Sequence, residues 1–386
     1  MQFGMWAYPW DIVDKGPQEA VDELVDIGID SLYVAANYHT VQAFSTHNPE
    51  RKTFFTDASA YFEPSEDYGE LAPVQNEQMQ AEQADWIAEV ADAASDSPLQ
   101  LNAWVVGCHN STLGMEHEEY ALESPFGDPL VFGLCPSQPA VQKYLKTMLA
   151  DLDSNYPFED VLLETFHYFH GSGWSWHHDK FHTDIGELGE YLLGLCFCEE
   201  CQQNARDAGV AVEEARKLSK ETILALAEGE MDSDVEPREW LEQNEAVEAY
   251  SDVRQETLSA LYEEFASETD VNIGGFIGMK GIDNSWMHGL DLETLQGTVD
   301  YFTIMDYLPS TEEVIETYEH STDRITETPV RAGILPGHPI VDTKEAVTDQ
   351  IVALSETDTE EVTIYNYGLL PERNLSWVKD GIEQVN

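Results

Sequence analysis

Three of the five cysteines in this sequence fall within six positions, as Cys196, Cys198 and Cys201 in the stretch CFCEEC. A closed structural zinc site needs four cysteine or histidine ligands, so this stretch can supply three of them. Cys108 and Cys135 are both available as the fourth. An odd cysteine count in a reducing compartment disfavours a disulfide framework, and the surrounding pattern of elements disfavours a thioredoxin-like redox pair. The spacing therefore favours a metal site with no catalytic role of its own.

Two carboxylates interrupt apolar, strand-like runs. Glu164 lies in VLLETF and Asp306 lies in FTIMDY. Burying an ionised carboxylate alone is costly, so each must be paired or functional. Glycosidic cleavage typically uses two carboxyl groups, about 5 Å apart in retaining enzymes and several ångströms wider in inverting ones. Glu164 and Asp306 are therefore the candidate catalytic residues. The alternative is that one of them anchors an arginine or caps a loop.

The segment after Glu164 is rich in histidine and tryptophan. The stretch FHYFHGSGWSWHHDKFH, residues 166–182, contains five histidines. One interpretation is a catalytic metal site in the loop 167–182, which would make the protein a metal-dependent hydrolase or isomerase. The stretch has no H-E-x-x-H or comparable ligand spacing. We therefore favour a loop that stacks on a substrate and hydrogen-bonds to it.

Eight short apolar runs, rich in β-branched and aromatic residues, are the elements that must position these groups. They cover residues 2–10, 31–39, 99–110, 161–169, 271–279, 299–307, 330–338 and 361–368. Amphipathic helical patterns separate most of them, at residues 16–28, 77–94, 139–156, 310–325, 343–356 and 373–385. Alternating strands and helices predict parallel strands with crossover helices. Eight such units predict an α/β fold of the (β/α)8 TIM barrel type.

The connections from strand to helix are long, notably residues 40–78, 111–137 and 170–184. A barrel elaborated in this way builds its site at the C-terminal ends of its strands. The segment 185–268 is longer than one crossover helix requires. We expect it to hold two or three helices as an insertion between the fourth and fifth strands of a single domain, residues 1–386.

The predicted strands end in aromatic, amide and imidazole side chains. This composition suits a neutral, polyhydroxylated ligand, so we expect a small carbohydrate substrate. The alternative is that some of the rings fill the barrel interior, although interior layers favour Val, Ile and Leu. The candidate substrate-binding residues are Trp6, Tyr8, Asn37, Tyr38, His39, Trp104, His109, Asn110, His167, Tyr307, His338, Tyr365 and Asn366.

The charge is extreme, with 75 Asp and Glu against 18 Lys and Arg and a formal net charge of −57. Such a field repels nucleic acids and anionic membrane surfaces, so neither is an expected partner. Because the acids recur along the whole chain, we interpret them as the surface of a halophilic protein, screened by molar salt. The N-terminal stretch has no signal-peptide pattern, so we expect a cytoplasmic protein. A homo-oligomer is compatible with all these features.

The order of three motifs resembles that of the β-galactosidases of glycoside hydrolase family 42 and of related uncharacterised glycosidase-like barrels. The motifs are LCPSQPAVQKY at residues 134–144, the glutamate that ends the fourth strand, and CFCEEC. In that family the glutamate is the acid/base, and four cysteines hold a structural zinc beside the barrel. The resemblance implies that Glu164 is the acid/base here. It also implies zinc ligands at Cys135, Cys196, Cys198 and Cys201.

The sequence departs from the family pattern in three ways. Leu163 precedes the glutamate where the family has asparagine, and the loop between Glu164 and Cys196 is longer. The family nucleophile is a glutamate that ends the seventh strand, but VRAGILPGHP has no carboxylate. Either Asp306 supplies the second carboxyl group, or the barrel binds carbohydrate without hydrolysing it. By analogy with barrels that pair strands 4 and 6, Glu164 could instead be the nucleophile and Asp306 the acid.

Overall fold

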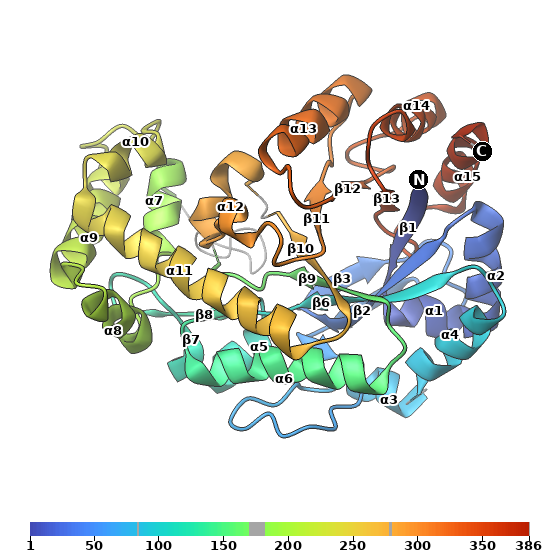
Figure 1. Ribbon diagram of the computed structural model, residues 1–386, viewed down its shortest axis with the longest axis horizontal. Coiled ribbons are helices and arrows are strands. Elements are labelled where there is room, and N and C mark those ends of the chain that lie inside the picture. The colour runs from blue at the N-terminus through green and yellow to red at the C-terminus, as the bar shows by residue number, and fades with distance from the viewer. Residues whose placement is uncertain (83–84, 170–181, 278–279, 386) are drawn as a thin grey trace.

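Eight parallel strands close into a barrel in the computed structural model of the chain, which describes residues 1–82, 85–169, 182–277 and 280–385 (Figure 1). Each strand pairs with the next around the barrel, and the last pairs with the first. In this order the strands are β1 (Gln2–Ala7), β2 (Ser31–Tyr38), β6 (Gln100–Val106), β9 (Asp160–Glu164), β10 (Asn272–Phe276), β11 (Tyr301–Met305), β12 (Val330–Ile334) and β13 (Glu361–Ile364). Each coincides with one of the eight predicted runs, which confirms the (β/α)8 barrel.

The predicted runs extend beyond the C-terminal ends of the strands. β6 ends at Val106 and β9 at Glu164, whereas the runs continue to residues 110 and 169. After β9, Thr165 has a φ of 54°, in the left-handed region, which turns the chain out of the sheet. The mostly aromatic residues beyond it, 166–169, are buried outside the sheet. We call the end of the barrel formed by the C-terminal ends of the strands the barrel mouth. Apolar runs alone do not distinguish this burial from a longer strand.

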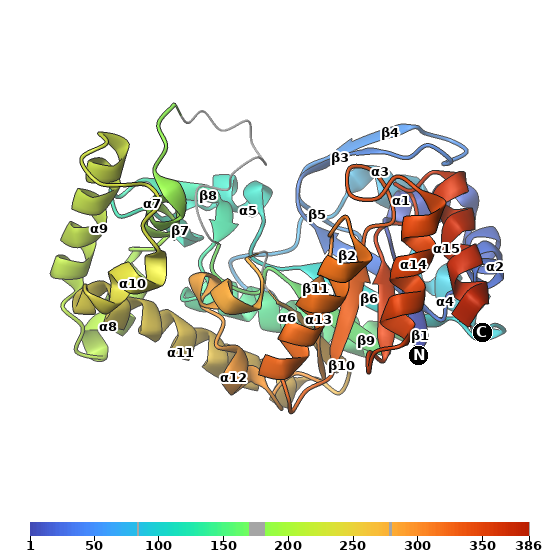
Figure 2. The same cartoon turned by 90° about the horizontal axis from the view of Figure 1, so that it is seen from above.

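Short strands lie within the long connections that follow β2 and β6. They form two antiparallel hairpins and one strand beside β2, and Figure 2 shows both hairpins along the same side of the molecule. They are β3 (Val41–Phe44), β4 (Thr53–Thr56), β5 (Ser59–Ala60), β7 (Ala121–Glu123) and β8 (Pro129–Leu134). The sequence pattern does not predict these strands, because most are too short to show a recognisable alternation of apolar and polar residues.

Helices surround the barrel in the predicted places. For example, α2 begins at Pro17 and ends before Gly28, which has a left-handed φ of 99°. No helix in the described part of the chain is long and apolar enough to cross a membrane. The helices outside the insertion are α1 (Pro9–Lys15), α2 (Pro17–Ile27), α3 (Glu77–Glu82), α4 (Trp86–Ser95), α5 (Ser111–Glu116), η1 (Glu118–Tyr120), α6 (Pro139–Asn155), η2 (Ile282–His288), α12 (Leu292–Leu295), α13 (Thr311–Arg324), α14 (Lys344–Ser355) and α15 (Glu372–Val385).

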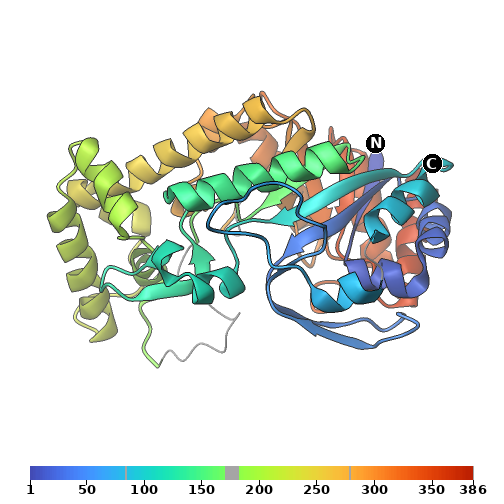
Figure 3. The same ribbon diagram turned by 90° about the horizontal axis from the view of Figure 1, so that it is seen from below.

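The described residues between β9 and β10 form five helices, rather than the expected two or three. They are α7 (Gly186–Leu193), α8 (Glu199–Asp207), α9 (Val212–Ala227), α10 (Pro237–Glu242) and α11 (Glu245–Glu268). The sequence analysis undercounts them because several have only six to nine residues. The helices α7 to α10 gather to one side of the barrel, and the long α11 runs back beside α6 (Figures 1 and 3). The division into a single domain stays a prediction.

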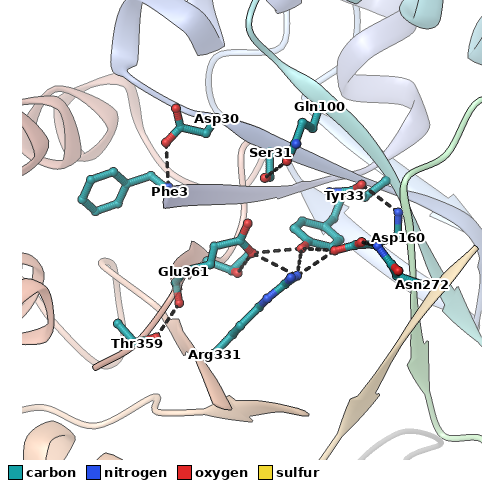
Figure 4. A network of polar contacts seen from close by, with 12 residues as sticks. Phe3, Asp30, Ser31, Tyr33, Gln100, Asp160, Asn272, Arg331, Thr359 and Glu361 are labelled. Atoms are coloured by element: carbon teal, nitrogen blue, oxygen red, sulfur yellow. Dashed lines mark hydrogen bonds and ion pairs between the residues drawn. The ribbon is translucent and has the colours of Figure 1, made fainter. Parts of the chain in front are cut away.

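A buried ion-pair network closes the end of the barrel opposite the mouth (Figure 4). The Arg331 Nη1 donates to Asp160 Oδ2 at 2.7 Å and to the Tyr33 hydroxyl at 2.8 Å. The same nitrogen lies 4.0 Å from Glu361 Oε1, which also accepts a hydrogen bond from Tyr33 at 2.9 Å. The Arg331 guanidinium lies over the Tyr301 ring, 3.4 Å from its centroid. One arginine therefore compensates two carboxylates inside the barrel, at the ends of strands far apart in sequence.

We expect Arg331→Met to lower the free energy of unfolding by about 3–5 kcal/mol, because it leaves two buried carboxylates without their cation. Arg331→Lys keeps the charge but not the planar guanidinium, so its loss should be smaller. Denaturant unfolding of the three proteins at one fixed salt concentration measures both differences. A change below about 1 kcal/mol in Arg331→Met would show that the network does not stabilise the barrel.

Candidate active site

Glu164 is the last residue of β9, and its carboxyl group lies at the barrel mouth. Side chains alternate along the strand, so Asp160, Leu162 and Glu164 all face the barrel interior. The Trp104 indole N–H on neighbouring β6 donates to Glu164 Oε2 at 2.6 Å. Burial raises the pKa of Glu164 to about 7, and the bond from Trp104 opposes that rise. The side chain remains partly exposed, so a ligand in the mouth can reach it.

Four tyrosines, which we call the tyrosine cluster, surround this carboxyl group: Tyr8, Tyr38, Tyr307 and Tyr365. The Tyr8 hydroxyl hydrogen-bonds to Tyr365 at 2.8 Å and to Tyr38 at 3.2 Å. The rings of Tyr307 and Tyr365 lie 5.7 Å apart between centroids. Burial raises the pKa of each tyrosine, and the charge of Glu164 raises it further. The structure therefore brings these sequence candidates together around one acid.

Asp306 directly follows β11, and its N–H donates to the Gly333 carbonyl oxygen at 2.7 Å, which continues the sheet ladder. Met305, the residue before it, pairs with Gly333 of β12. A side chain at Gly333 would meet the Trp6 ring, so Gly333 and Met305 both face the barrel interior. Alternation therefore directs the Asp306 side chain away from the interior, toward the surrounding helices. Burial raises its pKa to about 8, and neither carboxyl oxygen has a hydrogen-bond partner among the described residues.

The two candidate carboxylates face in different directions. Glu164 faces the barrel interior at the tyrosine cluster, and its charge raises the pKa of Tyr307. Alternation along β11 instead directs Asp306 away from the interior, so the described residues do not bring it to the tyrosine cluster. Their pairing in catalysis stays a prediction.

Trp6 lies inside the barrel, only 1% exposed. Its ring contacts Tyr33, Trp104, Phe276 and Tyr365, with centroids 5.9–6.4 Å apart. Trp6 therefore fits the alternative left open by the sequence, in which a ring fills the barrel interior. Trp6 supports the base of the mouth, while the more exposed Tyr307 and Tyr365 are better placed to contact a ligand.

The three candidate amides hydrogen-bond within the fold. Asn37 Nδ2 donates to the Val106 carbonyl oxygen at 2.6 Å, between β2 and β6. Asn110 caps α5 by accepting from a backbone N–H at 3.0 Å, and Asn366 accepts from the Gly368 N–H at 3.0 Å. All three are buried. In this structure they hold the loops of the mouth in place, a role that the sequence analysis does not anticipate.

The candidate histidines fall into two groups and one outlier. His39 and His109 stack on each other with centroids 4.6 Å apart, and both are buried. His167 packs against His288 at 4.6 Å and bonds through Nδ1 to the Tyr168 carbonyl oxygen at 2.9 Å. Burial lowers the pKa of His167 to about 4, and the charge of Arg254 adds to this, so the imidazole is neutral near pH 7. His338 is exposed beyond the end of β12.

Two buried residues near the mouth were missed by sequence reasoning, namely Arg254 and His288. Arg254 lies on the buried face of α11, and its guanidinium stacks over the Tyr168 ring with 4.3 Å to the centroid. An arginine at an apolar position of a helix was the available signal. The histidine-rich loop 167–182 lies mostly outside the described residues, since 170–181 are not among them.

The second cluster of chemical interest is the cysteine cluster, Cys135, Cys196, Cys198 and Cys201. Their four Sγ atoms lie within 4.8 Å of one another, all are buried, and none forms a disulfide. The structure selects Cys135 and leaves the fifth cysteine, Cys108, outside the cluster. Cys135 precedes α6, and the other three lie at the start of α8. The cluster therefore joins the barrel to the insertion.

The geometry of the cysteine cluster fits a tetrahedral metal ion. The Sγ of Cys135 lies 3.4 Å from that of Cys201 and 3.6 Å from those of Cys196 and Cys198. A tetrahedral zinc with bonds of about 2.3 Å places its sulfur ligands about 3.8 Å apart. The Glu123 N–H donates to Cys196 Sγ at 3.3 Å, a bond that favours a thiolate. The described residues contain no other group of this kind.

The chain resembles known proteins in structure but not detectably in sequence. No protein-family model matches the chain, and no curated protein matches its sequence. The fold resembles α-L-fucosidase isoenzyme 2 from Paenibacillus thiaminolyticus (TM-score 0.60, 10% identity) and a β-galactosidase from the psychrophilic Marinomonas ef1 (TM-score 0.58, 11% identity). All of this chain is covered in both, but it spans only 49% and 59% of those chains.

A third similar structure is closer to this chain in size. It is the PgaB (BpsB) glycoside hydrolase domain from Bordetella bronchiseptica, with a TM-score of 0.53 and 13% identity, covering 100% of this chain and 98% of that one. At such identities these similarities show the barrel fold that the chain shares with glycoside hydrolases.

Proposed function

We propose that the protein is a glycoside hydrolase that cleaves a neutral glycoside at the barrel mouth, with Glu164 as its acid/base. The observation that carries this proposal is the environment of Glu164. Its carboxyl group is partly exposed at the end of β9, is bonded by Trp104, lies within the tyrosine cluster, and has a pKa of about 7. The fold shared with glycosidases supports the same reaction class.

The chemistry follows from these groups. A carboxyl group with a pKa near 7 can hold a proton for the leaving-group oxygen and take one from water at neutral pH. The tyrosine rings can stack on the C–H faces of a sugar, and their hydroxyls can hydrogen-bond to its hydroxyl groups. A second carboxyl group completes the usual mechanism, and Asp306 is the proposed partner from the sequence.

A second candidate function is a barrel that binds carbohydrate without cleaving it. The observation in its favour is that strand alternation directs Asp306 away from the barrel interior and the tyrosine cluster. Screening aryl glycosides in molar salt separates the two functions. Release of the aryl group supports the hydrolase. Thermal shifts induced by sugars, without any release across the panel, would support the binder instead.

We expect kcat/KM to fall above about pH 7, because Glu164 must hold a proton to act as the acid. Trp104→Phe removes an N–H donor that favours the ionised carboxylate. The pKa of Glu164 should therefore rise, and the alkaline limb should move to higher pH. Profiles of kcat/KM from about pH 5 to 9 at constant salt measure this shift. An alkaline limb that stays in place would show that Glu164 does not control it.

We further propose that the cysteine cluster holds a structural zinc ion, as its four thiols and their spacing suggest. When bound, the ion would supply cross-linking of the insertion to the barrel. A catalytic metal in the histidine-rich loop is the alternative. In that case chelation abolishes activity without lowering stability, whereas loss of the structural ion lowers stability.

The net charge of −57 leads us to propose adaptation to molar salt and a cytoplasmic location.

A further inference from the structure

Arg254 is a buried cation that forms no ion pair with a carboxylate in the part of the chain that the structure describes. It lies on α11, is 2% exposed, and none of its three guanidinium nitrogens has a hydrogen-bond partner among the described residues. Its contacts are the faces of Tyr168 and Tyr191, with 4.3 and 5.9 Å to the ring centroids. An isolated buried charge is costly. Within the described residues no carboxylate forms an ion pair with this arginine, so its charge needs another partner there.

A short chain of hydroxyl groups connects Arg254 to the cysteine cluster. The Tyr168 ring, which lies under the guanidinium, carries a hydroxyl 2.6 Å from the Ser137 Oγ. The Ser137 Oγ lies 3.2 Å from the Cys201 Sγ. Tyr168 therefore lies between the Arg254 guanidinium and the Cys201 sulfur.

A metal-loaded cysteine cluster would supply a negative charge that balances the Arg254 guanidinium. Four thiolates around a divalent ion carry a net charge of about −2, and all four cysteines are buried. A nearby cation favours that state over the neutral thiols of the metal-free protein. In the metal-free protein, no carboxylate among the described residues pairs with Arg254 to supply this charge. The arginine should therefore stabilise the loaded form and destabilise the empty form.

We propose that Arg254, Tyr168 and Ser137 form an outer shell of the cysteine cluster. In this shell the guanidinium offsets the charge of the metal-bound thiolates. In the structure the Cys201 thiol donates to the Ser137 Oγ; once metal binding removes that proton, the hydroxyls of Tyr168 and Ser137 would donate in series toward the Cys201 Sγ. Residues around metal ligands orient them and tune metal affinity in this way. The inference rests on the proposal that the cluster binds a divalent metal. It also links the metal site to β9, because Tyr168 lies four residues after Glu164.

The test is metal affinity of the full chain, measured with Zn²⁺ by chelator competition and with Co²⁺ by its thiolate charge-transfer absorption. We expect Arg254→Met to weaken Zn²⁺ binding about 10- to 100-fold, and Arg254→Lys to weaken it less. Tyr168→Phe keeps the ring and removes the hydroxyl, so a loss of about 2- to 10-fold is expected. Arg238→Met is the matched control, because Arg238 instead stacks on Trp286, 4.6 Å from the ring centroid.

Stability of the metal-free protein separates this role from simple packing. Arg254→Met should be as stable as the wild type without metal, or more stable, because an uncompensated cation has been removed. Equal Zn²⁺ affinity in the wild type, Arg254→Met and Tyr168→Phe would overturn the outer shell and leave the metal site standing. If the wild type binds neither Zn²⁺ nor Co²⁺, the metal site itself fails, and the outer shell with it. If Arg254→Met does not fold, Arg254→Lys and Tyr168→Phe decide the question.

Discussion

Glu164→Gln is expected to lower kcat/KM for glycoside hydrolysis by about 10²–10⁴-fold while the protein still folds. The amide has nearly the same shape as the carboxyl group and can still accept the 2.6 Å bond from Trp104. It cannot transfer a proton at any pH. Hydrolysis of the best aryl glycoside, measured in molar salt at pH values around 7, gives the ratio. An unchanged far-ultraviolet circular dichroism spectrum and melting temperature confirm that folding is intact.

Asp306→Asn is the matched carboxyl-to-amide control. Asp306 is as buried as the core, and strand alternation directs its side chain away from the tyrosine cluster. A loss as deep as that of Glu164→Gln would support the predicted catalytic pair. Activity near that of the wild type would remove Asp306 from the mechanism and leave Glu164 as the acid/base. Full activity in Glu164→Gln would contradict the proposed site as a whole.

Cys198→Ser is expected to have a large effect on metal binding and stability. Structural zinc sites with four ligands bind with roughly 10–16 kcal/mol, so one ligand accounts for about 3 kcal/mol, or about 10²-fold in affinity. Wild-type protein should carry one zinc ion per chain, and this variant should lose it to a competing chelator. Because the cluster joins α6 to α8, the variant should also melt at a lower temperature.

Cys108→Ser is the control for this experiment. Cys108 is equally buried but is not part of the cysteine cluster. Its substitution should leave the zinc content at the wild-type value. A chelator should lower the melting temperature of the wild type and of Cys108→Ser, and change that of Cys198→Ser little. Equal zinc content in the wild type and Cys198→Ser would show that the cluster is not the metal site.

The barrel was predictable because strand and helix patterns alternate over the whole chain and depend only on local sequence. Spacing alone did not decide between Cys108 and Cys135 as the fourth cysteine. The family resemblance implied Cys135, and the fold places Cys135 in the cluster. Similarly, the contact between Trp104 and Glu164 depends on the register of β6 against β9, which pairs Val106 with Glu164. Register is a property of the folded sheet and cannot be obtained from either strand alone.

Charged residues inside the fold were the hardest to predict. Arg331 compensates Asp160 and Glu361, which come from strands distant in sequence, and no local pattern pairs them. Arg254 belongs to the same class, since its environment is built by residues of α7 and the segment after β9. By contrast, Asn110 was locally predictable as a helix cap, because it directly precedes α5. Its aromatic neighbours drew the interpretation toward substrate binding instead.

The most direct test of the central claim, that Glu164 protonates the leaving group, is the dependence of the Glu164→Gln defect on the leaving group. Two aryl glycosides of the same sugar are compared, one with a phenol that needs protonation and one with a dinitrophenol that does not. The proposed role predicts a large loss of kcat/KM for the first and a much smaller loss for the second. An equal loss for both substrates, or no loss for either, would contradict it.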